Sequence, residues 1–166
     1  ANGTNIGGAT GTSYVLTEAE VGQTITVVAS YTDGHGTAES VSSAATAAVV
    51  NVNDAPTGAV TISGTPTQGL TLTAANTLAD ADGLGTITYQ WRANGAIIAG
   101  ATGTTYVLTE AEVGQTITVV ASYTDGHGTN ESVSSAATAA VANVNDAPTG
   151  SVTIDDVIAM TCSGVS

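Results

Sequence analysis

Oxygen-bearing side chains gather at a few points of the chain, and their types are those that bind calcium. The sequence Asn-Asp-Ala-Pro occurs twice, and short acidic loops and turns lie elsewhere. Ca²⁺ takes about six to eight oxygen ligands from carboxylates, amide side chains and carbonyl groups. The candidate calcium ligands are Asn53, Asp54, Asn145, Asp146, Asp33, Asp125, Asp80 and Asp82. The alternative is that each Asn-Asp pair before proline forms an ordinary turn, in which the side chain bonds its own backbone.

Four glutamates lie in two short acidic segments that could add further donors. Glu20 and Glu112 each follow a threonine by three residues. This is the spacing of a capping box, so we expect them to cap a short helical turn rather than to bind a ligand. Their neighbours Glu18 and Glu110 stay free to face solvent or a metal ion.

The residue pattern gives catalysis little support. His35 and His127 each lie in a glycine-flanked turn, where we expect an exposed side chain. About one domain length separates them, which excludes a shared zinc site. A nucleophile needs a base within reach and a third group to orient that base. Serine and threonine are instead scattered along the predicted strands, so we expect a protein that is not an enzyme.

Composition limits the possible partners. The formal net charge is −13, from 14 acids against one base, Arg92. Such a surface repels phosphate and anionic lipid, which excludes nucleic acid and membrane partners, and it attracts divalent cations. No apolar run approaches the roughly 18 residues of a membrane helix, and the lone Cys162 cannot form an internal disulfide. No signal peptide opens the sequence, so we expect any export signal to lie outside it.

A long internal repeat organises the whole chain. Residues 1–62 align with residues 93–154, 92 positions later, and the two copies differ at seven places. A fixed period of domain size indicates tandem domains. The sequence therefore divides into the C-terminal part of one repeat (1–55), a complete repeat (56–147) and the start of a third, divergent repeat (148–166).

The complete repeat has the pattern of a β-protein. Apolar and polar residues alternate in several short segments, and Asn94-Gly95 is a strong hairpin signal. In the segment before Asp125, Ile117 and every second residue after it are expected to face inward. The segments predicted as strands include 60–62, 70–74, 87–91, 117–123 and 131–144, the last with a bulge. About seven strands without a helix longer than one turn predict an immunoglobulin-like β-sandwich of about 92 residues.

One order of motifs resembles the bacterial immunoglobulin-like tandem repeats. The motifs are Trp91, Asn94-Gly95, Gly100-Ala101-Thr102, Tyr106 to Gly114, Ile117 to Val119 and Asp125-Gly126. The resemblance implies a repeat of a giant surface adhesin exported by type I secretion, hence a bacterial, extracellular or cell-surface location. The Asn-Asp-Ala-Pro linker resembles the cadherin-type junction that holds calcium between domains. It departs from that pattern at Asn51 and Asn143, where aspartate is usual, and it is one residue shorter.

Three functions from different classes are compatible with this pattern. The favoured one is a structural extender whose partners are the neighbouring repeats of the same chain, with calcium stiffening the junctions. The second is a filament subunit in which residues 148–154 complete a truncated repeat of another copy by strand addition. The third is a carbohydrate-binding module, which requires exposed aromatic side chains. Trp91 falls on the inward period of its strand, which disfavours the third function. The adhesive target is not encoded in these residues.

Overall fold

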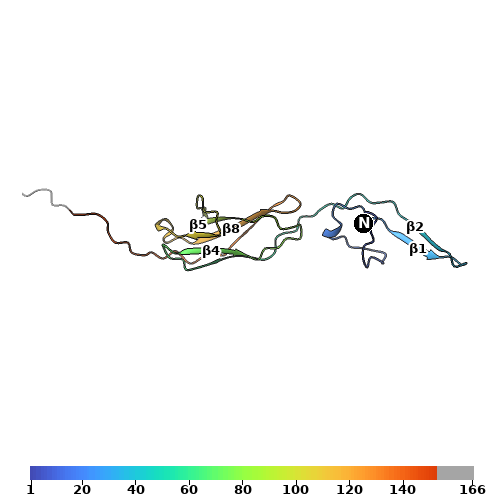
Figure 1. Ribbon diagram of the computed structural model, residues 1–166, viewed down its shortest axis with the longest axis horizontal. Helices are drawn as coiled ribbons and strands as arrows, with labels where there is room; N and C mark the ends of the chain where they lie inside the picture. Colours follow the sequence, from blue (N-terminus) through green and yellow to red (C-terminus); the bar gives the residue numbers. More distant parts are fainter. Residues whose placement is uncertain (153–166) are drawn as a thin grey trace, which may run out of the picture.

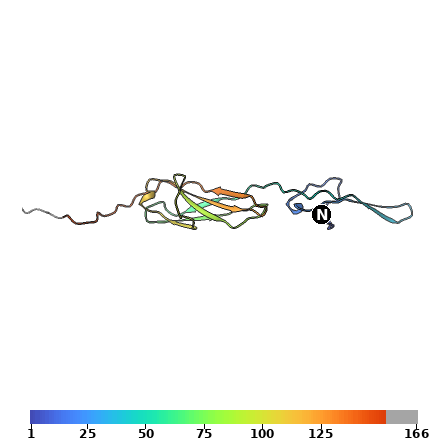
Figure 2. The same cartoon turned by 90° about the horizontal axis from the view of Figure 1, so that it is seen from above.

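The chain folds almost entirely as antiparallel β-structure. The computed structural model describes residues 1–152, and Figure 1 shows their strands and two short 3₁₀ turns, η1 (Glu18–Glu20) and η2 (Glu110–Glu112). The molecule is elongated: a smaller part, residues 1–55, lies in line with a larger part, residues 56–147 (Figures 1 and 2). Among the described residues, no helix combines the length and the apolar character needed to cross a membrane.

Residues 56–147 form two antiparallel sheets. One sheet has the strand order β3-β4-β7 and the other has the order β6-β5-β8-β9. The strand bounds are β3 Val60–Ser63, β4 Thr71–Asn76, β5 Thr88–Ala93, β6 Ala96–Ile97, β7 Thr105–Val107, β8 Ile117–Thr124 and β9 Asn130–Ser134. The two sheets contact each other through β3 and β8, so their facing sides enclose one apolar core.

The core is built from the inward residues of both sheets. Strand β8 alternates buried and half-buried residues from Ile117 to Tyr123, as its sequence predicts. Trp91 on β5 and Leu72 on β4 are fully buried. The Trp91 indole N–H donates to the carbonyl of Gly103 at 2.8 Å, which satisfies the one polar group that this ring buries. The single tryptophan of the chain is therefore part of the core and leaves no polar group unsatisfied there.

Two local signals in the sequence form the turns that they predict. Asn94 and Gly95 both have positive φ, 46° and 83°, and they join β5 to β6 as a two-residue hairpin turn requires. In η2, the Thr109 N–H and hydroxyl both donate to Glu112 Oε2, at 2.9 and 2.7 Å. The capping box is confirmed, and it explains why a carboxylate as buried as that of Glu112 is tolerated.

The last predicted strand, 131–144, is wrong in its length. Strand β9 ends at Ser134, because side-chain hydroxyls then replace backbone carbonyls as acceptors. The Val119 N–H donates to Ser135 Oγ at 3.1 Å, and the Ile117 N–H donates to Thr138 Oγ1 at 3.0 Å. Such local side-chain bonds interrupt a sheet ladder. Beyond them the chain makes isolated parallel bridges between Val141 and Val113 and between Ala142 and Thr67.

The start of β4 also differs from the prediction. The alternation places Leu70 on this strand, but β4 begins at Thr71 and Leu70 remains 48% exposed. Leu70 instead closes the preceding turn, since its N–H donates to the carbonyl of Thr67 at 3.0 Å. The first residue of β4 that faces the core is therefore Leu72.

Residues 1–55 keep the local structure of the repeat without its core. A two-stranded sheet joins β1 (Val28–Thr32) to β2 (Ala38–Ser42), in the register that β8 and β9 also use. Every residue of both strands is exposed. Strand β1 begins three positions later than its copy β8, because β8 pairs there with β5.

The predicted third repeat, residues 148–166, lies mostly outside the described residues. Residues 148–152 are described and belong to no strand or helix.

Candidate metal centre

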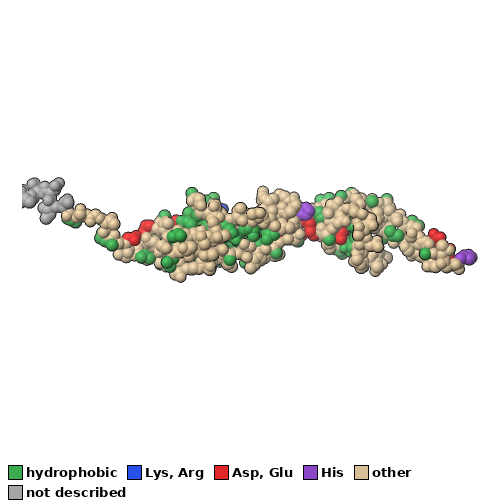
Figure 3. Space-filling model, viewed as in Figure 1, with side chains coloured by type: hydrophobic (Ala, Val, Ile, Leu, Met, Phe, Trp, Pro, Cys, Tyr) green, Lys and Arg blue, Asp and Glu red, His purple; other side chains and the backbone are tan. Residues whose placement is uncertain are grey.

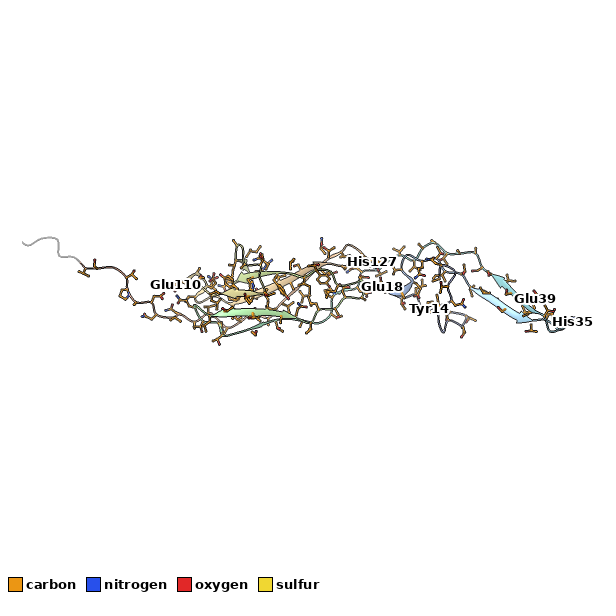
Figure 4. All side chains as sticks on the ribbon, in the orientation of Figure 1. Tyr14, Glu18, His35, Glu39, Glu110 and His127 are labelled. Carbon is orange, nitrogen blue, oxygen red and sulfur yellow. The ribbon has the colours of Figure 1, made fainter. Side chains whose placement is uncertain are left out.

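Three segments far apart in the sequence meet where residues 1–55 join residues 56–147. Glu18 comes from η1, Asp82 from the loop before β5, and His127 from the turn between β8 and β9. One possible ligand atom from each side chain lies within 4.8 Å of the other two. Figure 3 shows acidic groups and a histidine at the narrow waist of the molecule, and Figure 4 shows Glu18 and His127 side by side there. We call this meeting point the junction.

Glu18 and His127 are in direct contact. His127 Nε2 lies 2.6 Å from Glu18 Oε1, and about one third of each side chain remains exposed. Because a carboxylate only accepts, this contact is a hydrogen bond when Nε2 carries the proton. The capping box of η1 holds the segment that carries Glu18: the Thr17 N–H and hydroxyl both donate to Glu20 Oε2 at 2.9 Å.

Asp82 is the most buried member of the cluster. It is 4% exposed, and its Oδ2 accepts the Asp54 N–H at 2.6 Å. Its Oδ1 is buried and has no hydrogen-bond partner. The Asp82 carbonyl also accepts the Gly126 N–H at 3.0 Å, and a Cβ at position 126 would lie only 2.5 Å from that carbonyl oxygen. Glycine at position 126 therefore allows the turn of His127 to approach the loop of Asp82.

Asp125 organises the turn that carries His127. Its Oδ1 accepts the backbone N–H groups of His127 and Thr129, each at 2.8 Å. Burial raises the pKa of Asp125, but these backbone hydrogen bonds outweigh it, so the pKa lies below its ordinary value. Asp125 Oδ2 is buried and has no partner. The carboxylate is thus ionised at neutral pH, with one oxygen left for a further contact.

The linker itself is attached to residues 56–147. Asn53 Nδ2 donates to Glu131 Oε1 at 2.8 Å, in addition to the contact between Asp54 and Asp82. Asn51 Oδ1 is also buried without a partner. The linker is therefore held by direct hydrogen bonds, while the buried oxygens Asn51 Oδ1, Asp82 Oδ1 and Asp125 Oδ2 accept none among the described residues.

The structure brings together some of the eight predicted calcium ligands and separates others. Asp82 has a ligand atom in the cluster with Glu18 and His127. Asp54 reaches Asp82 through its backbone N–H, Asn53 contacts Glu131, and Asp125 shapes the turn of His127. Asp80 lies in the same loop as Asp82, but its Oδ1 accepts the Asp82 N–H and its Oδ2 accepts the Tyr123 hydroxyl.

The remaining three predicted ligands lie at the two ends of the molecule. Asp33 lies in the turn of His35 at the far tip (Figure 4), where it accepts the N–H groups of His35 and Thr37. At the opposite end, Asp146 Oδ2 accepts from Gln68 Nε2 at 3.1 Å. Asn145 precedes Asp146 and is exposed.

Sequence reasoning left Glu18 open and predicted an exposed side chain for His127. His127 is exposed as predicted, and it also contacts Glu18, which the sequence did not indicate. The two residues are 109 positions apart, so no local pattern pairs them. The feature of the sequence that could have indicated this contact is the 92-residue repeat. The parallel bridge between Val21 and Val49 places η1 beside the approach to the linker, and both must then meet the first loops of the next repeat.

The donor set decides which ions fit the junction. The unpartnered oxygens of Asn51, Asp82 and Asp125 are hard ligands of the kind that calcium binds. The three ligand atoms that converge, however, include the imidazole nitrogen of His127, and imidazole suits first-row transition ions better. The residues therefore suit a divalent cation held by mixed oxygen and nitrogen donors.

Comparison with protein-family models, with curated proteins and with solved structures found no match. The functional conclusion therefore depends on the repeats of the chain and on the geometry of the junction.

Proposed function

We propose that the chain is a structural extender, without enzymatic activity, from a bacterial cell-surface adhesin or exported fibre. Its units would be immunoglobulin-like β-sandwiches of about 92 residues in tandem. The near-identity of the two copies supports this, since number and spacing matter most in such arrays. The two antiparallel sheets around Trp91 are compatible with the sandwich, because β4 in one sheet and β8 in the other alternate inward and outward residues.

The observation that carries the proposal is the fixed linker. Three contacts of different types connect residues 1–55 to residues 56–147. They are the Asp54 N–H with Asp82, the Asn53 amide with Glu131, and Glu18 with His127. A flexible linker lets neighbouring domains fold back on each other, whereas contacts on both sides of the linker keep them in line. In-line repeats extend a distal binding domain away from the cell.

Calcium is part of this proposal. The groups that would hold it at the junction are the carboxylates of Asp82, Asp125 and Asp54 and the amide oxygens of Asn51 and Asn53. An ion bound to both the linker and the following loops would remove the remaining freedom of the junction. The same ion would also offset part of the strong negative charge of the chain.

Small-angle X-ray scattering of the chain, in calcium and in chelator, tests the extender function. We expect an elongated particle, and a further gain in stiffness and melting temperature with calcium. The matched control carries a flexible Gly-Ser insertion after Asp54, which should shorten the mean end-to-end distance. A parent chain that is as compact or as flexible as this control would overturn the extender function. If calcium changes neither the melting temperature nor the dimensions of the chain, the calcium part of the proposal is wrong and the extender function still stands.

One observation favours the filament subunit as a second candidate. The inward face of residues 1–55 is uncovered, with Val27 and Tyr31 more than 60% exposed, and a strand from another copy could cover it. The predicted donor, residues 148–154, is described only to residue 152. Sedimentation at increasing concentration tests this candidate, because a chain that stays monomeric excludes it. The carbohydrate-binding candidate gains no such support, since Trp91 is buried.

A further inference from the structure

We propose that Glu18, Asp82 and His127 form a binding site for a first-row divalent metal ion that accepts imidazole, with Zn²⁺ the best match. The ion would connect residues 1–55 to residues 56–147. The inference rests on the extender part of the proposed function and gives an alternative to calcium at the same junction, since both ions would use Asp82. It differs from the calcium hypothesis in the ion, in the donor set and in the two residues, Glu18 and His127, that sequence reasoning did not assign.

The geometry already approaches a coordination shell. The three ligand atoms lie within 4.8 Å of one another, and two of them, His127 Nε2 and Glu18 Oε1, are 2.6 Å apart. Around a tetrahedral zinc with bonds of about 2.0–2.2 Å, neighbouring ligand atoms are roughly 3.3 Å apart. Small rotations of two partly exposed side chains therefore suffice. The proton on His127 Nε2 would leave to solvent as the nitrogen binds the ion.

Asp82 gives the second, independent observation. Its side chain is 96% buried, and its Oδ1 has no hydrogen-bond donor among the described residues. A buried carboxylate oxygen without a partner is costly. The chain has one basic side chain of the Lys and Arg type, Arg92. Arg92 pairs with Thr118 near the start of β8, at the end opposite the turn of His127. A cation from solution can supply the missing contact.

The choice of metal follows from the donors. Calcium and magnesium prefer shells made entirely of oxygen, whereas zinc accepts imidazole and carboxylate together. Copper would bind such a site still more tightly, but it favours square-planar or tetragonal sites, while the cluster offers three donors from three directions. Two carboxylates and one imidazole leave a fourth position for water.

The repeat supplies matched controls for two of the three ligands. His35 occupies the same Asp-Gly-His-Gly turn as His127, and Glu110 occupies the same capped turn as Glu18. Figure 4 shows His35 at the far tip and Glu110 at the opposite end of the complete repeat, each away from the junction. A change at His35 or Glu110 thus removes the same chemical group from the same local sequence without altering the cluster.

Calorimetric titration of zinc chloride into the metal-free, tag-free chain tests the proposal. All variants carry Cys162→Ser, so that the thiol cannot bind the ion. We expect one zinc per chain, at least 10-fold weaker binding in Glu18→Gln, Asp82→Asn and His127→Gln, and unchanged binding in Glu110→Gln and His35→Gln. Circular dichroism melting checks that each variant folds. Cobalt substitution should give visible absorption bands that His127→Gln loses.

Several outcomes would overturn the metal site. These are the absence of saturable zinc binding by the parent, equal losses in His35→Gln and His127→Gln, and calcium binding at the same stoichiometry that His127→Gln leaves unchanged. The last result would assign the junction to oxygen donors alone. None of them affects the extender function, which scattering of the metal-free chain tests separately through its dimensions.

Discussion

The most informative comparison lies within the chain, between residues 14–42 and their copy, residues 106–134. The two segments are nearly identical in sequence, but their surroundings differ. Val27 is 65% exposed and its copy Val119 is 0% exposed, while Tyr31 and its copy Tyr123 are 62% and 4% exposed. Among the described residues, the strands that cover the second copy, β3, β4 and β5, have no counterpart around the first. Whether a residue of this segment is buried therefore depends on the strands that cover it, and not on the sequence of the segment itself.

The hydrogen bonds, by contrast, are almost the same in both copies. The hairpins share one register, and both capping boxes form. The bond from the Val119 N–H to Ser135 Oγ has its counterpart between Val27 and Ser43, at 3.0 Å. The capping boxes connect residues close in sequence, and the other contacts connect residues on the two arms of a single hairpin. Local sequence therefore determines them, while the core requires strands from elsewhere in the chain.

Supplying the missing strands should give the largest effect. A peptide with the sequence of residues 56–92, added to the chain, should cover β1 as β3 and β5 cover its copy β8. We expect slower amide hydrogen exchange by at least 10-fold across residues 25–31, because those amides gain a partner strand and a core. A scrambled peptide is the control. Unchanged exchange would show that the first copy cannot accept this cover.

Truncating a core residue should come next in size. Leu108 is 1% exposed and its copy Leu16 is 47% exposed. Leu108→Ala should reduce the free energy of unfolding of residues 56–147 by about 2–5 kcal/mol through lost burial and the cavity left behind. Leu16→Ala should change it by less than about 0.5 kcal/mol. Fluorescence of Trp91 during urea unfolding reports on this part alone, and equal effects of the two changes would contradict the comparison.

A buried hydroxyl should have a smaller effect. Ser135 is 8% exposed and accepts the Val119 N–H. Ser135→Ala leaves this buried donor without a partner, at a cost of about 1–3 kcal/mol. Ser43→Ala, in the exposed copy, lets water take over and should be nearly neutral. The same unfolding measurement distinguishes the two, and a neutral Ser135→Ala would show that water also reaches Val119.

The smallest expected effect concerns alkaline pH. Burial, with Glu112 adding to it, raises the pKa of Tyr106 from 10.0 to about 12. The protonated phenol is favoured in the folded state, so its contribution to stability is complete below pH 10 and is lost as the pH rises towards 12. Tyr106→Phe should flatten the fall in Trp91-reported stability over this interval. Tyr14→Phe, in the first copy, should leave that fall unchanged. Two parallel curves for Tyr106→Phe and the parent would refute the assignment.

Much of the fold could be predicted from the sequence because its determinants are local. The alternation from Ile117 to Tyr123, the Asn94-Gly95 hairpin and the Thr109 capping box all form as predicted. The last predicted strand continues beyond Ser134, whereas the observed strand ends there. Side-chain hydroxyl groups replace backbone carbonyls as acceptors at that point, and the alternation of apolar and polar residues carries no information about this competition.

The candidate site could be predicted only in part. Asp54 and Asp82 were among the predicted ligands, because acidic residues in a linker and in a first loop suggest a shared ion. Glu18 and His127 were not, because their contact depends on how one repeat meets the next. That geometry involves contacts between residues far apart in the sequence, such as Asn53 with Glu131 and Asp54 with Asp82, which no local sequence pattern contains.

The parallel bridges at the end of the complete repeat have a mechanical consequence. Val141 and Ala142 are bound to neighbours on both sides, through hydrogen bonds with Gly114, Gln115, Pro66 and Gln68 of 2.8 to 2.9 Å. Tension applied along the long axis of the molecule would pull this segment lengthwise past those neighbours, so the four bonds would share the load and break together rather than one after another. Forced unfolding depends on the height of the unfolding barrier. The four hydrogen bonds beyond β9 would therefore determine the force that is needed to unfold a repeat.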